Sequence, residues 1–144
     1  MLSKKSKILK TFAEIIYLFL IFLFCYTAAN KLVNLESFRT NLMKTSLFNE
    51  DFAEIFSWLV IGLEFVIVIL LLFYKKIGLF IFTFTMLIFT TYISFLRFKG
   101  LYEVCGCGGI LNGLQYQYHL YINIGLILGS SFCLYQFNFF KNEE

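Results

Sequence analysis

Four long apolar stretches constrain the fold of this chain more than any other feature of its sequence. They run from about residue 11 to 30, 55 to 74, 77 to 98 and 119 to 140. A helix needs about 20 mainly apolar residues to cross the hydrocarbon of a bilayer, and each stretch is long enough. The strands of a transmembrane β-barrel would instead alternate in hydrophobicity. The sequence therefore predicts an all-α, polytopic membrane protein in which residues 1–144 form a single domain, a four-helix transmembrane bundle.

The composition excludes two other classes of protein. Hydrophobic residues make up 60% of the chain and charged residues 15%, whereas a soluble domain has about 45–50% apolar and about 25% charged residues. A chain this short cannot bury such an excess in a soluble core. The net charge of +3 is spread over several segments and forms no basic face for nucleic acid. We therefore expect a lipid bilayer, and no nucleic acid, around the chain.

The distribution of lysine and arginine predicts the orientation of the bundle, because cytoplasmic loops carry an excess of both. With the amino terminus inside, the cytoplasmic side collects Lys4, Lys5, Lys7, Lys10, Lys75, Lys76 and Lys141, and the outer side collects Lys31, Arg39, Lys44, Arg97 and Lys99. The bias is modest, and the basic start of the chain strengthens it. Both termini then lie in the cytoplasm, and the connection that carries Cys105 and Cys107 lies outside.

The two outer connections differ in character. In the first, about residues 31–54, apolar residues recur at helical spacing: Leu32, Leu35, Phe38 and Leu42. That pattern predicts a short amphipathic helix on the outer surface, where it covers the bundle as a lid. The second connection, about residues 99–118, holds a glycine-rich segment from Cys105 to Gly113.

Cys105-Gly106-Cys107 is the main chemical signal in the sequence. Two cysteines separated by one residue can form a disulfide only in a small, strained ring, and Gly106 makes that ring feasible because it lacks a Cβ. A strained, exposed disulfide is a better oxidant than a structural one. The alternatives are a glycine turn with two incidental thiols and a copper(I) or zinc site with His119. A structural zinc site needs a fourth ligand that is not evident, so we predict no metal.

The other two cysteines, Cys25 and Cys133, fall inside apolar stretches. A buried thiol usually acts as a small hydrophobe, and we expect this of Cys133, which lies too deep to reach the loop. The same interpretation is favoured for Cys25, with thiol exchange between Cys25 and either loop cysteine as the alternative.

His119 opens the fourth stretch and shares one helical stripe with Asn123 and Ser130. An imidazole near a thiol can lower the thiol pKa or relay its proton. The alternative is a histidine that caps the helix or hydrogen-bonds the loop. On the same helix Gly125 and Gly129 make a small-xxx-small face, which predicts close helix packing.

Glu64 lies near the middle of the second stretch, where a carboxylate is costly and by default faces the bundle interior. We expect it to be protonated or to pair with a polar group, such as the hydroxyls that share a face of the third stretch: Thr83, Thr90, Thr91 and Ser94. Its functional alternatives are a proton relay and a hydrogen bond to a quinone ring. Its structural alternative is an internal hydrogen bond.

With these residues in view, the chain resembles the MauE/DoxX-like redox-associated membrane proteins, and the methylamine utilisation (MauE) branch most closely. The resemblance covers nearly the whole chain. It depends on residues 26–32 at the end of the first stretch, on Phe38 and Glu64, and most specifically on residues 105–111 followed by residues 119–123. Many relatives have phenylalanine or serine where this chain has Gly108, and the usual proline between the first two helices is missing. Neither departure removes a candidate redox residue.

The resemblance implies a four-helix bundle in the bacterial inner membrane that helps to make or maintain periplasmic disulfides. MauE-like proteins are associated with the disulfide-rich small subunit of methylamine dehydrogenase, and DoxX-like relatives with quinone-coupled sulfur oxidation. The cofactor stays open, with a quinone as the candidate.

We therefore predict a thiol–disulfide redox protein in which Cys105 and Cys107 exchange with a periplasmic thioredoxin-like or disulfide-containing protein. His119 would tune the thiols, and Glu64 would serve a quinone or a proton relay. Because we find one outer cysteine pair, a partner membrane subunit is expected to complete the electron path. The alternative is a non-enzymatic chaperone, anchor or assembly subunit whose cysteine loop is structural or binds a metal.

Overall fold

The residues that the structure describes form five helices, one of them short. The computed structural model describes residues 2–45, 47–101 and 115–139. In chain order the helices are α1 (Leu2–Val33), α2 (Leu35–Lys44), α3 (Glu50–Phe73), α4 (Lys75–Phe98) and α5 (Tyr116–Phe139). The described residues contain no strand. The prediction of an all-α protein is therefore confirmed.

Four of these helices are long and apolar enough to cross a membrane. The qualifying segments are Lys7–Val33, Glu50–Phe73, Lys75–Phe98 and Tyr116–Asn138. At about 1.5 Å per residue, α1 is longer than the roughly 30 Å of hydrocarbon in a bilayer. The candidate span within α1 begins at Lys7, so the first residues of the helix precede it. The predicted polytopic membrane protein is confirmed, and a lipid bilayer is its environment.

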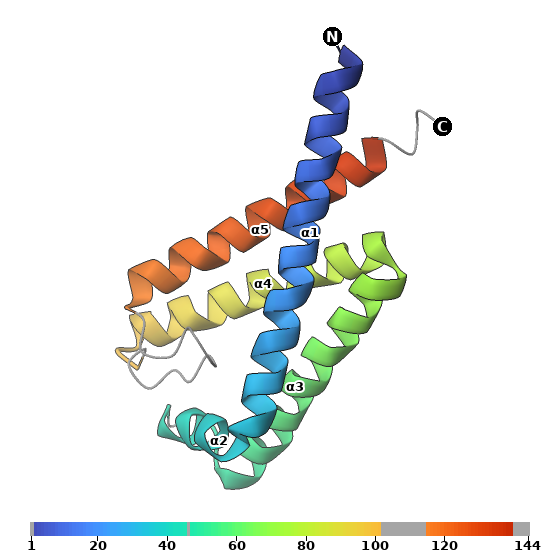
Figure 1. Cartoon of the computed structure of the whole chain (residues 1–144). Coiled ribbons are helices and arrows are strands. Elements are labelled where there is room, and N and C mark those ends of the chain that lie inside the picture. The colour runs from blue at the N-terminus through green and yellow to red at the C-terminus, as the bar shows by residue number, and fades with distance from the viewer. Residues whose placement is uncertain (1, 46, 102–114, 140–144) are drawn as a thin grey trace.

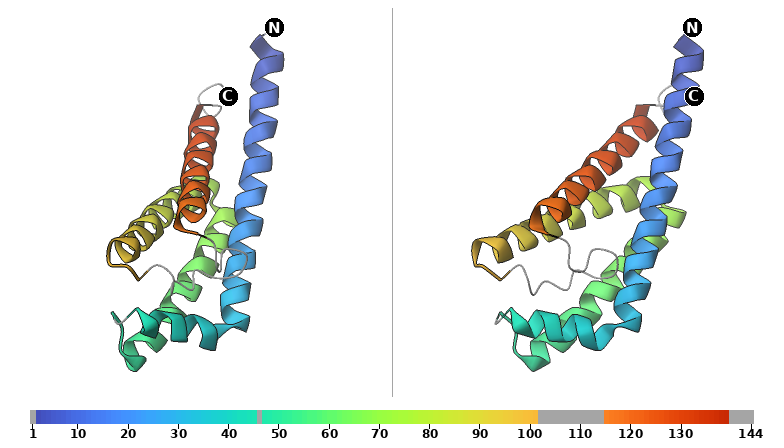
Figure 2. Two further views of the ribbon diagram at one scale, coloured as in Figure 1. Left: turned by 90° about the vertical axis from the view of Figure 1, so that its left-hand side faces the viewer. Right: turned by 60° about the vertical axis from the view of Figure 1, so that its left-hand side comes forward.

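The four long helices close into a bundle. α1 and α4 each pack against both α3 and α5, so α1 and α4 lie across the bundle from one another. The short helix α2 packs on α3 and α1. The start of α1 and the end of α5 lie at one end of the bundle, and α2 lies at the other (Figures 1 and 2). The carboxyl-terminal end of α4 and the amino-terminal end of α5 are directed toward the end of the bundle that holds α2 (Figure 2).

The distribution of apolar side chains is that of a protein in lipid. A core of buried residues fills the space between the helices and includes Leu20, Phe24 and Phe82. The outer faces carry large exposed hydrophobic residues, among them Phe22 and Phe80. Soluble monomers rarely expose such continuous apolar surface. The four long helices thus carry apolar side chains on two faces. One face packs against protein, and the other is expected to contact acyl chains.

The turn between α3 and α4 requires a glycine. Gly78 lies in the first turn of α4, and a Cβ built on it would stand 2.6 Å from the backbone nitrogen of Leu71. The Tyr17 hydroxyl donates a hydrogen bond to the Leu71 carbonyl at the same place.

The predicted close packing at the two glycines of α5 is found at one of them. A Cβ on Gly129 would meet Ile16 at 3.3 Å, whereas one on Gly125 would meet nothing within 4 Å.

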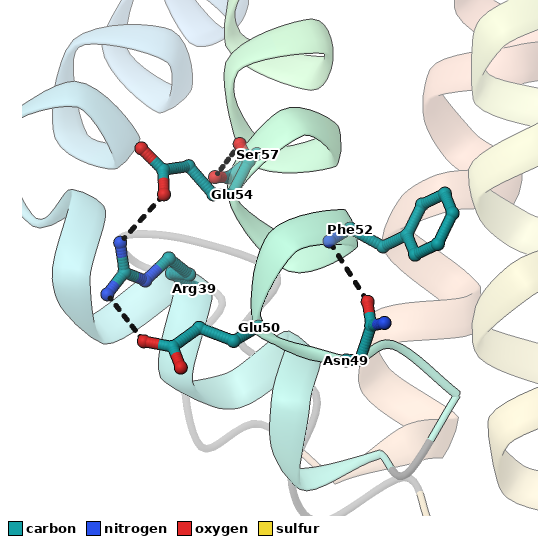
Figure 3. A network of polar contacts seen from close by, with 6 residues as sticks. All are labelled: Arg39, Asn49, Glu50, Phe52, Glu54 and Ser57. Atoms are coloured by element: carbon teal, nitrogen blue, oxygen red, sulfur yellow. Dashed lines mark hydrogen bonds and ion pairs between the residues drawn. The ribbon is translucent and has the colours of Figure 1, made fainter.

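Polar contacts hold α2 against the start of α3, as Figure 3 shows. Arg39 of α2 forms ion pairs with Glu50 at 3.8 Å and with Glu54 at 3.4 Å. Asn49 caps α3 by accepting a hydrogen bond from the backbone nitrogen of Phe52 at 3.1 Å. These contacts explain why α3 begins at Glu50, earlier than the apolar run at about residue 55. A helix start favours a capping side chain and acidic residues, and neither is apolar.

Replacing Asn49 with alanine is expected to destabilise the protein by about 1 kcal/mol, because a backbone N–H loses its capping partner. Unfolding in mixed micelles, titrated with a denaturing detergent and followed by helical circular dichroism, measures the loss. Asn34→Ala is the matched control, since Asn34 precedes α2 without making a side-chain cap. Equal losses in the two variants would contradict a specific role for the Asn49 cap.

Candidate functional site

A cavity of about 170 Å³ lies inside the bundle, at the end covered by α2. All five helices contribute to its lining. Most of the lining is apolar and rich in aromatic rings, and the polar exceptions include Lys31, Glu64, His119 and Asn123. Phe38 and Leu42 of α2 also line it. The prediction that the amphipathic helix covers the bundle is therefore confirmed.

A buried ion pair crosses one wall of the cavity. The Lys31 ammonium, near the end of α1, donates to Glu64 Oε1 in the middle of α3. The exposed fractions of the two side chains are 5% and 2%. The Lys31 Nζ also lies 5.6 Å from the ring centres of both Phe38 and Phe89. In an apolar interior neither charge can remain without the other, because an unpaired buried charge is strongly destabilising.

Glu64 keeps one oxygen without a partner. Its Oε2 is buried and makes no hydrogen bond in the described structure. Buried polar atoms are satisfied in the large majority of cases, so each exception needs an explanation. The whole residue is only 1% exposed and lines the cavity. A hydrogen-bond acceptor is thus available at the cavity wall.

His119 and Asn123 lie one turn apart on α5 and line the same cavity. Each is 3% exposed, so the polar stripe that the sequence indicated on this helix faces the bundle interior. Ser130 continues the stripe beyond the cavity lining, where its hydroxyl oxygen accepts a hydrogen bond from the Thr83 hydroxyl at 2.8 Å. The polar residues of the cavity wall therefore include His119 and Asn123 on α5, Lys31 on α1 and Glu64 on α3.

The sequence suggested the hydroxyls of α4 as possible partners of Glu64. In the structure Glu64 does not pair with them. Those hydroxyls donate to carbonyls of their own helix: Thr83 to Leu79, Thr90 to Met86, Thr91 to Leu87 and Ser94 to Thr90. Threonine and serine in membrane helices commonly satisfy their hydroxyls in this way. The partner that the carboxylate finds is a lysine on another helix.

Lys31 is the site residue that the sequence analysis missed, because it was counted as a topology signal on the outer surface. The chain did contain a signal. Phe24, Thr27 and Lys31 follow one another at helical spacing, and residues so spaced lie on one face of a helix. All three line the cavity.

The structure describes two of the four cysteines, Cys25 and Cys133. Cys105 and Cys107 lie outside the described residues. Cys133 is fully buried, and its thiol donates to the Ala13 carbonyl at 3.3 Å, which confirms the expectation of a packed, buried thiol. Cys25 is exposed on the surface of α1, so the expectation that it is buried is wrong.

Within residues 2–45, 47–101 and 115–139, no group of three His, Cys, Asp or Glu side chains could hold a metal ion. The alternative metal site of Cys105, Cys107 and His119 has two of its three members outside those ranges.

Four membrane-spanning helices around a buried lysine–glutamate pair define a polytopic membrane protein with a largely apolar cavity inside its bundle. Residues 9–136 match the family model described as methylamine utilisation protein MauE, and the chain belongs to this family. No curated protein and no solved structure matches the chain.

Proposed function

We propose that this protein is an inner-membrane thiol–disulfide redox protein whose reactive groups are Cys105 and Cys107. The observation that carries the proposal is that the helix following the cysteine segment in the sequence lines the cavity from its first turn. α4 ends at Phe98 and α5 begins at Tyr116, and His119 in the first turn of α5 lines the cavity. Membership of the MauE family supports the same assignment.

The proposed chemistry is disulfide exchange. A thiolate attacks one sulfur of the Cys105–Cys107 disulfide and forms a mixed disulfide while the other cysteine leaves as a thiolate. A second thiol of the partner then displaces the bound cysteine, so the partner gains a disulfide and the pair becomes a dithiol. Two electrons have moved from the partner to the pair. His119 is proposed to take up and return the proton of the nearer thiol.

The proposed orientation puts both termini in the cytoplasm and the cysteine segment in the periplasm. Four membrane crossings return the chain to its starting side, so the termini share one side and the connection between α4 and α5 lies on the other. The lysines near the start of the chain favour the cytoplasm for the termini. The periplasm tolerates disulfides and the cytosol does not. The proposed partner is a periplasmic thioredoxin-like or disulfide-containing protein, with a further membrane subunit to complete the electron path.

The second candidate function is a non-enzymatic assembly subunit. The ion pairs of Arg39 with Glu50 and Glu54 favour it, because they fix α2 on the bundle and present a polar outer surface (Figure 3). In this alternative the partner binds α2, and the cysteine segment has only a structural role.

The thiol state of the purified protein tests the redox proposal. A variant with Cys25→Ser and Cys133→Ala leaves Cys105 and Cys107 as its only thiols. We expect maleimide mass-tagging across a graded glutathione series to give one reversible transition between zero and two tags. Cys105→Ser in the same background should abolish that transition.

Two results would contradict the redox proposal. Either both thiols stay reduced under oxidising conditions, or their bond resists all but harsh reduction. Full support of partner oxidation by a Cys105→Ser, Cys107→Ser variant would favour the assembly subunit.

A further inference from the structure

The unpartnered oxygen of Glu64 and the cavity beside it indicate a ligand. The cavity volume of about 170 Å³ is close to that of an engineered protein cavity of about 150 Å³ that binds benzene. One six-membered ring with small substituents therefore fits. Several aromatic side chains line the space, among them Phe24, Phe38 and Phe89, and aromatic rings pack well edge to face or offset against another ring.

The polar side chains restrict the ligand further. Glu64 Oε2 needs a hydrogen-bond donor. Lys31 has three N–H donors and uses one on Glu64 Oε1. The Asn123 amide supplies both a donor and an acceptor and lines the same space. A ring that carries an oxygen on each of two sides, one of them a hydroxyl, would satisfy these groups.

The cavity also reaches the lipid-facing surface of the bundle. Ile88 of α4 lines the cavity and is nevertheless 51% exposed, so the rim of the cavity extends to the outer face of α4. A molecule that arrives from the bilayer could leave an apolar tail there. The ligand is thus expected to be lipid-soluble, with a polar ring as its head.

We propose that the cavity bounded by Lys31, Glu64 and Asn123 binds the ring of a lipid-soluble benzoquinol, with one ring hydroxyl donating to Glu64 Oε2. The assignment rests on the proposed function for its redox meaning. The oxidised quinone form of the same ligand is the electron acceptor that the cysteine pair requires, and the quinol is the product that the site holds. Oxidation of the Cys105 and Cys107 thiols to one disulfide releases two electrons and two protons. These convert one quinone to one quinol, whose two hydroxyls carry the protons.

Direct binding tests the proposal without any measurement of turnover. The full-length protein in nanodiscs is titrated calorimetrically, without oxygen, with a decyl-substituted benzoquinol and with the same molecule methylated on both oxygens. We expect saturable binding of one quinol per chain. Methylation removes the donor and should weaken binding about 5- to 150-fold, since leaving a buried acceptor unsatisfied costs about 1–3 kcal/mol.

Two variants sharpen the test. Glu64→Gln should weaken quinol binding by a similar factor. The amide oxygen keeps the hydrogen bond from Lys31, so the amide NH2, a donor, takes the place of the acceptor Oε2. Glu54→Gln is the matched control on α3, since Glu54 is exposed and absent from the cavity lining, and it should bind like the wild type. If Glu64→Gln fails to fold, the proposal is still tested by comparing the affinities of the wild-type protein for the quinol and for its dimethyl ether.

The experiment separates this proposal from the redox function. The Cys105→Ser, Cys107→Ser variant retains the cavity and should bind the quinol with unchanged affinity. If the thiols do not cycle but quinol binding persists, the redox function fails and the binding site stands. Equal affinity for the quinol and its dimethyl ether, or partition into the nanodisc without saturation, would overturn the binding site.

Discussion

Replacing Lys31 with methionine is expected to destabilise the protein by about 3–5 kcal/mol, the usual cost of removing one partner from a buried ion pair. Methionine fills a similar volume and suits an apolar interior, so the loss comes mainly from the carboxylate left behind. Glu64 would then have neither oxygen paired. Titration with a denaturing detergent in mixed micelles, followed by circular dichroism, measures the change.

Two further variants identify the cause of that loss. The double variant Lys31→Met, Glu64→Leu removes both charges and should recover most of the stability, since apolar replacements of buried pairs are often neutral or better. Lys44→Met is the control, because Lys44 lies exposed at the end of α2, and it should change little. A Lys31→Met loss below about 1 kcal/mol would mean that the pair behaves like one on a surface.

Replacing Gly78 with alanine is expected to cost about 1–3 kcal/mol, the typical penalty for overpacking a well-packed contact. The added Cβ would lie 2.6 Å from the Leu71 nitrogen and 2.7 Å from the Leu71 Cα. Both atoms are backbone, so no flexible side chain can move aside. The start of α4 must instead shift away from the end of α3.

Thermal unfolding reports this shift through Cys133, whose buried thiol becomes reactive toward a fluorescent maleimide only when the bundle opens. The measurement uses a background without the other three cysteines. Gly62→Ala is the matched control: Gly62 lies inside α3, and a Cβ there meets nothing within 4 Å. It should be neutral or slightly stabilising, because alanine favours helix more than glycine does. Similar unfolding temperatures for the two variants would contradict the close contact at Gly78.

The spans were predictable because apolar length is a local property of the sequence. The same holds for α2, whose apolar residues Leu35, Phe38 and Leu42 repeat at helical spacing. The helix starts were predicted too late. Glu50 and Asp51 begin α3, and Tyr116 begins α5, but polar residues at a helix start carry no hydropathy signal. Caps and end charges determine these boundaries.

The site was predicted in part. Glu64 was expected to face inward because a charged group in a membrane helix avoids lipid, and it is buried. His119 and Asn123, which the sequence placed on one helical stripe, are buried as well. The pairing of Glu64 with Lys31 could not be derived, since it depends on how α1 and α3 approach one another. Charge counting also assigns every lysine near a span end to water. The roles of Cys105 and Cys107 stay predictions.

The buried pair also bears on how the protein assembles. The two charges are 33 residues apart in the chain, and translation delivers Lys31 first. Until α3 follows, the lysine lacks the carboxylate with which it pairs in the folded protein, and its long side chain can reach toward the membrane surface. Glu64 arrives with the opposite problem and has no such reach. Each charge, when unpaired, therefore opposes insertion of its helix into the membrane. Pairing of the two charges favours association of α1 with α3.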